Sequence, residues 1–125
     1  MTWIDAIDHI QITTSPDLQD EMRFFYGTLL GLTPLEQPKS LQNNGIAWYQ
    51  LGHIQLHIST EKDATNYASR RHICFRVQSL SAFRQHLSTH NIDIIPDQQP
   101  IEEYDRFYLR DPGGNRIEVA ALKQK

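Results

Sequence analysis

The sequence contains one cysteine, Cys74, among its 125 residues, so no disulfide can join two parts of the chain. It also lacks any run of about 18 consecutive apolar residues, the length that a membrane-spanning helix needs. Its first residues, beginning Met1-Thr2-Trp3, contain no basic stretch followed by an apolar segment, which is the pattern of a secretion signal. We therefore expect a protein of the reducing cytoplasm with no membrane partner.

An excess of positive charge is missing as well. Twelve Lys and Arg stand against 15 Asp and Glu, and the net charge at pH 7 is −3. Without a positive field a protein is not drawn to nucleic acid, so nucleic-acid binding is not expected. The hydrophobic fraction of 39% and the charged fraction of 22% are typical of a globular protein. A chain of this length has room for one domain, and we expect residues 1–125 to form it.

The first half of the sequence is predicted to form four strands and one helix. Between Ile7 and Thr13 apolar and polar residues alternate, which is the period of a half-buried strand. Ser15 and Pro16 form a helix start, and apolar residues then recur at spacings of three and four up to a helix end at Gly31. These apolar positions are Leu18, Met22, Phe25, Tyr26 and Leu29. The strands are expected at 7–13, 32–35, 46–51 and 54–59, with a loop containing Asn43-Asn44-Gly45 before the third.

The second half repeats this order. Ser79 is predicted to cap a helix that carries Leu80, Phe83 and Leu87 on one side and stops at Asn91. Strands are expected at 71–77, 92–95, 106–110 and 116–121, the last two joined by a turn over 111–115. Each half therefore predicts a β-α-β-β-β module, residues 1–61 and 70–121. The expected fold class is α+β, with two curved mixed sheets facing each other across a cleft.

The first and last strands of each module place a potential metal ligand on the polar face, at nearly the same separation in the two halves. These residues are His9, His57, His72 and Glu118. If the two sheets face each other, three imidazoles and one carboxylate converge, which suits one divalent ion of Zn, Ni, Co, Mn or Fe and not Ca²⁺. In an octahedral field two positions stay open for neighbouring oxygens of a substrate. Gln55 shares the face of His57, so either side chain could be the ligand from that strand.

The remaining residues of these polar faces are candidates to line a substrate pocket. They are Gln11, Trp48, Gln50, Cys74, Arg76, Arg106 and Tyr108. Arginines beside a metal favour an anionic substrate, although they could equally pair with Asp105, Asp111 or solvent. Trp48 could instead lie at a sheet edge or a dimer contact. Cys74 is expected to be a small lining residue and not a nucleophile, because no base is assigned to it.

Several short runs resemble the vicinal oxygen chelate superfamily. They are Asp8-His9-Ile10, Phe25-Tyr26-x-x-Leu29-x-Gly31-Leu32, Leu56-His57-Ile58, residues 72–77 and the run Asp111-Pro112-Gly113-Gly114-Asn115-Arg116-Ile117-Glu118. The superfamily includes glyoxalase I, extradiol dioxygenases, fosfomycin-modifying enzymes and bleomycin-binding proteins. The resemblance implies paired β-α-β-β-β modules, a metal in the cleft and commonly a homodimer. It leaves open whether the metal site lies within one chain or across a dimer.

Departures from the superfamily's patterns narrow the expected activity. The position matching His57 is typically a carboxylate in glyoxalase I, so the methylglyoxal reaction is not favoured. Bleomycin-type binders lack the metal ligands, and a fourth ligand at His57 would crowd the site of an extradiol dioxygenase. We therefore expect a metal-dependent lyase, isomerase or transferase that acts on a small oxygenated anion, with Glu118 or a metal-bound hydroxide moving a proton. The alternatives are an extradiol-type dioxygenase and a non-catalytic drug- or metabolite-binding protein.

Overall fold

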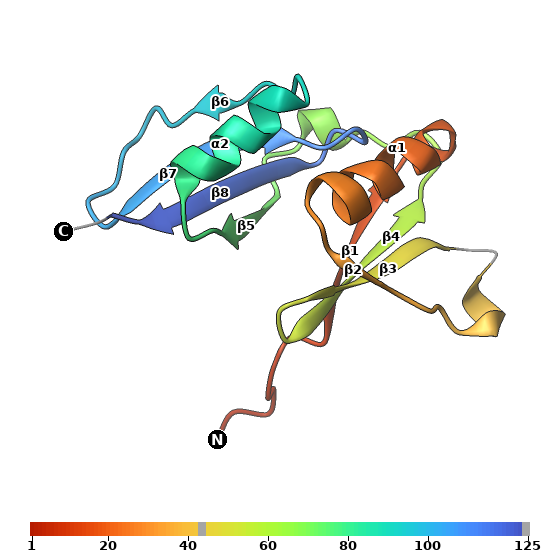
Figure 1. Cartoon of the computed structure of the whole chain (residues 1–125). Coiled ribbons are helices and arrows are strands. Elements are labelled where there is room, and N and C mark those ends of the chain that lie inside the picture. Colours follow the sequence, from red (N-terminus) through yellow and green to blue (C-terminus); the bar gives the residue numbers. More distant parts are fainter. Residues whose placement is uncertain (43–44, 124–125) are drawn as a thin grey trace. The chain divides into compact units, whose positions relative to one another are not determined.

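The structure, a computed structural model, describes residues 1–42 and 45–123 (Figure 1). Two compact units make up the chain, one over Met1–Thr65 and the other from Asn66 onward. The modules predicted at 1–61 and 70–121 each lie within one unit, and their joining into a single domain stays a prediction. The described residues include no helix long and apolar enough to cross a membrane.

Each unit contains one four-stranded mixed sheet, which confirms the predicted α+β class. The first sheet has the order β1-β4-β3-β2, and its strands are β1 (His9–Thr14), β2 (Thr33–Leu35), β3 (Gly45–Leu51) and β4 (Ile54–Thr60). The second has the order β5-β8-β7-β6, with strands β5 (His72–Arg76), β6 (Ile95–Pro96), β7 (Tyr104–Arg110) and β8 (Arg116–Leu122). Strand β1 runs parallel to β4 in the first sheet, and β5 runs parallel to β8 in the second. All other neighbouring strands are antiparallel.

The first helical segment is more irregular than the single amphipathic helix that the spacing predicts. It consists of a 3₁₀ turn, η1 (Pro16–Leu18), then α1 (Gln19–Arg23) and a π-helical segment, η2 (Phe24–Leu29). The glycine at position 27, a poor α-helix former, lies in this widened segment against the ring of Tyr49. The predicted apolar side is correct, since Met22, Phe25, Tyr26 and Leu29 are all buried. Gly31 follows with a φ of +74°, as expected for a left-handed helix end.

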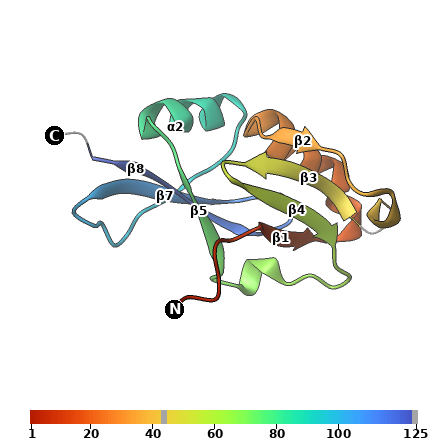
Figure 2. The ribbon, with the colours of Figure 1, turned by 90° about the horizontal axis from the view of Figure 1, so that it is seen from below.

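Helix α2 (Leu80–Thr89) forms as its capping residues predict. The hydroxyl of Ser79 accepts a hydrogen bond from the backbone N–H of Ala82 at 3.1 Å, and Asn91 has the left-handed φ of +57°. Figures 1 and 2 show α2 lying over one face of the second sheet. Leu87 is fully buried, and the ring of Phe83 stacks parallel to Phe107 of β7.

The strand predicted at 92–95 is wrong, because the sheet includes only Ile95 and Pro96 of this region. The backbone N–H of Ile92 donates to the carbonyl of Leu87 at 3.0 Å, so this residue closes helix α2. Pro96 has no N–H to donate and stands on an edge strand, where proline is tolerated. Two further 3₁₀ turns are η3 (Lys39–Leu41) and η4 (Asn66–Ala68). Of the predicted loop at 43–45, Asn43 and Asn44 lie outside the described residues.

Strand alternation gives each sheet one apolar and one polar face. The apolar faces carry Ile46, Tyr49, Leu56 and Ile58 in the first unit and Phe107, Leu109, Ile117 and Val119 in the second, all buried. The helical segments cover these apolar faces, with α2 on the second sheet and Met22 of α1 in the core of the first unit. The candidate ligands therefore stand on the opposite, polar faces.

Candidate functional site

The parallel strand pairs of the two sheets have the same register. The residues that lie side by side are Gln11 with His57 in the first sheet and Cys74 with Glu118 in the second. His9 precedes Gln11 by two residues on the same face, and His72 precedes Cys74 in the same way. This shared register explains why the candidate ligands recur at nearly equal separations along the chain. Each unit brings its own two candidates together on adjacent strands.

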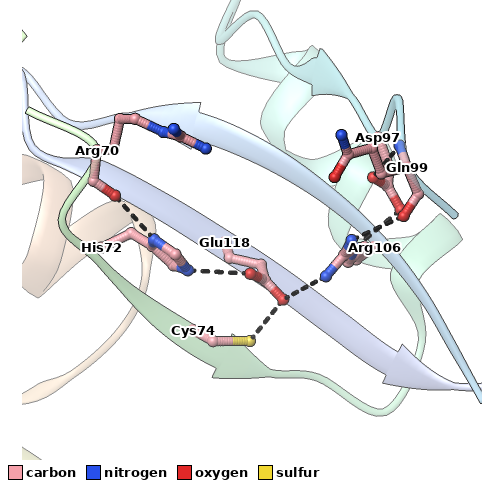
Figure 3. A network of polar contacts seen from close by, with 7 residues as sticks. All are labelled: Arg70, His72, Cys74, Asp97, Gln99, Arg106 and Glu118. Atoms are coloured by element: carbon pink, nitrogen blue, oxygen red, sulfur yellow. Dashed lines mark hydrogen bonds and ion pairs between the residues drawn. The ribbon is translucent and has the colours of Figure 1, made fainter. Parts of the chain in front are cut away.

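In the second unit, His72 and Glu118 form the closest pair (Figure 3). The Nε2 atom of His72 lies 3.1 Å from Oε1 of Glu118. The other ring nitrogen, Nδ1, is 3.0 Å from the carbonyl oxygen of Arg70. A carbonyl oxygen can only accept, so Nδ1 carries the hydrogen and the neutral ring has its lone pair on Nε2. Nε2 of the neutral ring and Oε1 of Glu118 would both point lone pairs at each other, and they repel at 3.1 Å unless a cation, either a proton or a metal ion, lies between them.

The second oxygen of Glu118 has different neighbours. Oε2 accepts a hydrogen bond from the thiol of Cys74 at 3.3 Å and lies 3.7 Å from the guanidinium of Arg106. The Glu118 side chain is only 12% exposed. Burial, together with the carboxylate of Glu118, raises the pKa of the Cys74 thiol to about 11. Because the thiolate is the nucleophilic form, Cys74 is not an activated nucleophile at neutral pH.

Arg106 is held in place by two residues that the sequence did not point to (Figure 3). Its Nε donates to Oδ2 of Asp97 at 2.8 Å, and its Nη2 donates to the carbonyl of Gln99 at 2.8 Å. The hydrogen bond from Arg106 lowers the pKa of Asp97, and in turn raises the pKa of Arg106. Asp97 and Gln99 lie in the loop after Pro96, where no spacing pattern marks a contact with β7.

Tyr108 forms the neighbouring wall of this polar face. The guanidinium carbon of Arg116 lies 4.4 Å from the centre of the Tyr108 ring, and the ring of His72 meets it edge-on at 6.1 Å. Burial is the main cause that raises the pKa of the Tyr108 hydroxyl. Arg76, predicted to line the same face, is exposed. The pairing of Arg106 with Asp97 replaces the alternative partners Asp105 and Asp111.

In the first unit the two histidines are stacked, ring on ring. The ring centres of His9 and His57 are 4.1 Å apart with 16° between their planes, and Trp48 stacks on the other side of His57 at 3.8 Å and 3°. His57 is 6% exposed, and its Nε2 lies 2.9 Å from Oε1 of Gln55. Burial is the largest cause that lowers the pKa of His57, and the nearby His9 lowers it further.

An open cavity of about 480 Å³ borders this stack within the first unit. Its lining includes His9, Gln11, Trp48, Gln55 and His57. The amide nitrogen of Gln11 donates to the hydroxyl of Ser59 at 3.1 Å. Gln50, also predicted to line the pocket, uses its amide nitrogen on the carbonyls of Gly52 and Ile54 in the β3–β4 turn.

Each unit offers a pair of side chains of the kinds that can ligate a divalent ion. The described residues form no group of three or more His, Cys, Asp or Glu side chains that could hold a metal, and the candidates occur as one pair per unit. His72 has its Nδ1 3.0 Å from the carbonyl oxygen of Arg70, and His9 has its Nδ1 2.8 Å from the carboxylate of Asp8. Metal-binding histidines typically engage their second ring nitrogen in this way. Asp8 and Arg70 make these contacts with the two candidate histidines, and the sequence reasoning did not assign them such a role.

Comparison with known proteins agrees with the fold. Residues 6–119 match the family model of the Glyoxalase/Bleomycin resistance protein/Dioxygenase superfamily. A glyoxalase family protein from Bacillus anthracis is 35% identical with a TM-score of 0.86, and the match covers 98% of this chain and 99% of that one. A comparison with curated proteins returned no significant match.

Two more distant structures share the fold. A glyoxalase/dioxygenase from Nostoc punctiforme is 22% identical with a TM-score of 0.75, over 95% of this chain and 92% of that one. A genomically encoded fosfomycin resistance protein from Listeria monocytogenes is 14% identical with a TM-score of 0.78, over 96% and 94% of the two chains. With the family model matching nearly the whole sequence, the chain belongs to the Glyoxalase/Bleomycin resistance protein/Dioxygenase superfamily.

Proposed function

We propose that the protein is a metal-dependent enzyme, a lyase, isomerase or transferase that acts on a small oxygenated anion. One divalent ion of Zn, Ni, Co, Mn or Fe would be held by His72 and Glu118 together with His9 and a side chain of β4, either His57 or Gln55. The observation that carries the proposal is the approach of His72 Nε2 to Glu118 Oε1 at 3.1 Å. Both atoms offer lone pairs, and a shared cation satisfies both at once.

The bound ion would supply Lewis acidity toward the oxygens of the substrate. The chain's own residues supply orientation and a site for a proton. With Oε1 of Glu118 turned to His72, Oε2 remains as the proton acceptor, and it already accepts a hydrogen bond from Cys74. Cys74 keeps its own proton at neutral pH, so it orients this oxygen without competing for the proton.

Charge on the second sheet supports an anionic substrate. Arg116 stacks on Tyr108, and within residues 1–42 and 45–123 it takes part in no ion pair. Its charge is therefore available to a carboxylate or phosphate group. Arg106 differs, because Asp97 already neutralises it and holds it beside Glu118.

Metal content of the purified protein tests the proposal. The wild-type protein should retain about one ion per site, whereas His72→Ala and Glu118→Ala should lose it. We expect each substitution to weaken metal affinity by more than the factor of about 10 to 100 that follows removal of an outer-shell partner. The matched control is His86→Ala/His90→Ala, since these two exposed histidines lie on and after helix α2 with their rings 4.9 Å apart. Substrates with two neighbouring oxygens are then screened with the retained metal restored.

Full metal retention by a His9→Ala/Glu118→Ala double variant would contradict the proposal. So would loss of the metal from the His86→Ala/His90→Ala control, because the ion would then lie on helix α2.

A further inference from the structure

Two histidines lie one helical turn apart at the end of helix α2. His86 belongs to the last turn of α2, and His90 is the residue that caps it. Both are exposed. Figures 1 and 2 show α2 over one face of the second sheet, whereas His72 and Glu118 stand on the opposite, polar face. Positions i and i+4 lie on the same side of a helix, so the two rings are neighbours on a surface that the site described above does not use.

The distance between these two rings is one that a shared metal ion requires. The ring centres of His86 and His90 are 4.9 Å apart, with 61° between the ring planes. Two imidazoles that bind one ion through nitrogen at about 2.1 Å, with an angle of about 90–110° at the ion, have ring centres about 4.6 to 5.3 Å apart. The helix therefore already holds the two rings at a separation that suits adjacent coordination positions.

The hydrogen bonds of His90 leave its lone pair on Nε2. Its Nδ1 lies 3.0 Å from the backbone carbonyl oxygen of His86, which can only accept a hydrogen bond. Nδ1 therefore carries the hydrogen of the neutral ring, and Nε2 is the unprotonated nitrogen. The hydroxyl of Thr89 donates to the same carbonyl at 2.7 Å and lies 3.2 Å from Nδ1. Metal-binding histidines commonly donate their second ring nitrogen to a backbone carbonyl in this way.

The ring of His86 is supported by Phe83. The centres of these two rings are 6.3 Å apart with 30° between their planes, and Phe83 stacks in turn on the buried ring of Phe107. Side chains that are already restrained lose less conformational entropy when they bind a ligand. The place on the helix favours a cation as well, because the carbonyl end of a helix carries partial negative charge.

We propose that His86 and His90 form a second metal site, which binds one transition-metal ion such as Ni²⁺, Cu²⁺ or Zn²⁺ through one nitrogen of each ring. Imidazole nitrogen suits these ions, and water fills the remaining positions. The bound ion joins the two ends of the last turn of α2 and stabilises the folded chain by mass action. Two ligands hold an ion less tightly than four, so this ion exchanges away during gel filtration. His86→Ala/His90→Ala therefore stays the control for the metal that the purified protein retains.

Calorimetric titration of Ni²⁺ alone into the full-length protein tests the site. The starting protein carries His72→Ala/Glu118→Ala, because it then lacks two ligands of the ion proposed above. One Ni²⁺ should bind per chain, and adding His90→Ala should weaken the affinity at least about tenfold, since the ion loses one of its two protein ligands. The matched control adds Gln85→His/His86→Ala instead. It keeps the number of histidines but moves one ring to a different side of the helix, so it should bind as weakly as the His90→Ala protein.

The position of the ion is checked by NMR in the same starting protein. Bound Ni²⁺ is paramagnetic, so the amide signals of residues 86–91 should broaden most. Broadening centred on His9 and His57 would overturn the inference, and so would an absence of Ni²⁺ binding. Unchanged affinity in the His90→Ala protein or in the spacing control would overturn it as well. The proposed function is tested separately by the metal that the wild-type protein retains, so either proposal can fail while the other stands.

Discussion

Glu118 is the residue on which the contacts of the second sheet converge. One oxygen faces His72, and the other faces Cys74 and Arg106. The cation beside this carboxylate, Arg106, is itself paired with Asp97 at 2.8 Å. Asp97 therefore holds the guanidinium of Arg106 beside Glu118. It also connects the loop after β6 to strand β7.

Asp97→Asn should lower the thermal unfolding midpoint at pH 7 by a few degrees. The folded-state pKa of Asp97 is lowered, so this group contributes stability above its ordinary pKa of 3.8, and the contribution is lost as the pH falls through the folded value. The difference between wild type and variant should therefore shrink below about pH 3.8. Thermal unfolding from pH 2.5 to 7 measures it, and Asp93→Asn, an exposed acidic residue of the same unit, is the control. A pH-independent difference would argue against the ion pair as the cause.

The turn between β7 and β8 is the element that sets the register of Glu118. The backbone N–H groups of residues 111 and 115 are both used here, since Asp111 N–H donates to the carbonyl of Asn115 and Asn115 N–H donates to the Asp111 carboxylate. Gly114 adopts a φ of +87° within it, and its carbonyl accepts from Arg110 at 2.8 Å. A slip of one residue along β8 would turn Glu118 to the opposite face of the sheet, so this turn is required for the site.

Gly114→Ala should destabilise the protein by more than about 1 kcal/mol, because a side chain is strained at this positive φ. The new Cβ would also lie 2.5 Å from the ring of Tyr67, but that ring is 67% exposed and can move aside. The double variant Gly114→Ala/Tyr67→Ala removes the clash and leaves the backbone strain. Urea unfolding should therefore show that the double variant is less stable than Tyr67→Ala by most of the free energy of unfolding that Gly114→Ala loses relative to wild type. A double variant as stable as Tyr67→Ala would assign the loss to the clash.

At the scale of the whole molecule, each unit contributes half of the proposed donors, and the first unit exposes apolar residues just before its first strand. Strand β1 lies at one edge of the first sheet. The segment before it carries Trp3 and Ile4, which are 88% and 77% exposed in the single chain. Open strand edges and exposed apolar residues are the features that pairing with a second chain removes from water. We therefore propose a homodimer, the commonest symmetric assembly.

Sedimentation equilibrium at low micromolar concentration should give twice the chain mass. Trp3→Ser/Ile4→Ser should shift the equilibrium toward the single chain, since it removes apolar area from the contact. Tyr67→Ser is the control, because it replaces an exposed aromatic residue of the other unit. A wild-type species of one chain mass with metal still bound would contradict the dimer while leaving the metal site in place, with all its ligands from one chain.

Features that depend on neighbours in the sequence were predicted well. The caps at Ser79 and Asn91, the stop at Gly31 and the alternation of β1 and β5 all follow from local backbone and side-chain preferences. That alternation was enough to place each module's two candidate ligands on one polar face. Strand 92–95 failed because Ile92 was needed to close a helix, which apolar spacing does not reveal.

Only the tertiary structure decided which atoms of these side chains are engaged. The stack of Trp48, His57 and His9 depends on strand register and ring orientation, and the bond from Gln55 decides which nitrogen of His57 holds the proton. The pairing of Arg106 with Asp97 depends on where a loop without periodicity lies beside β7. Alternation selects a face of a strand, whereas the path of a side chain on that face depends on residues distant in the sequence. For this reason the sequence determined the fold class and the face of the site, and the folded chain determined the partner of each functional group.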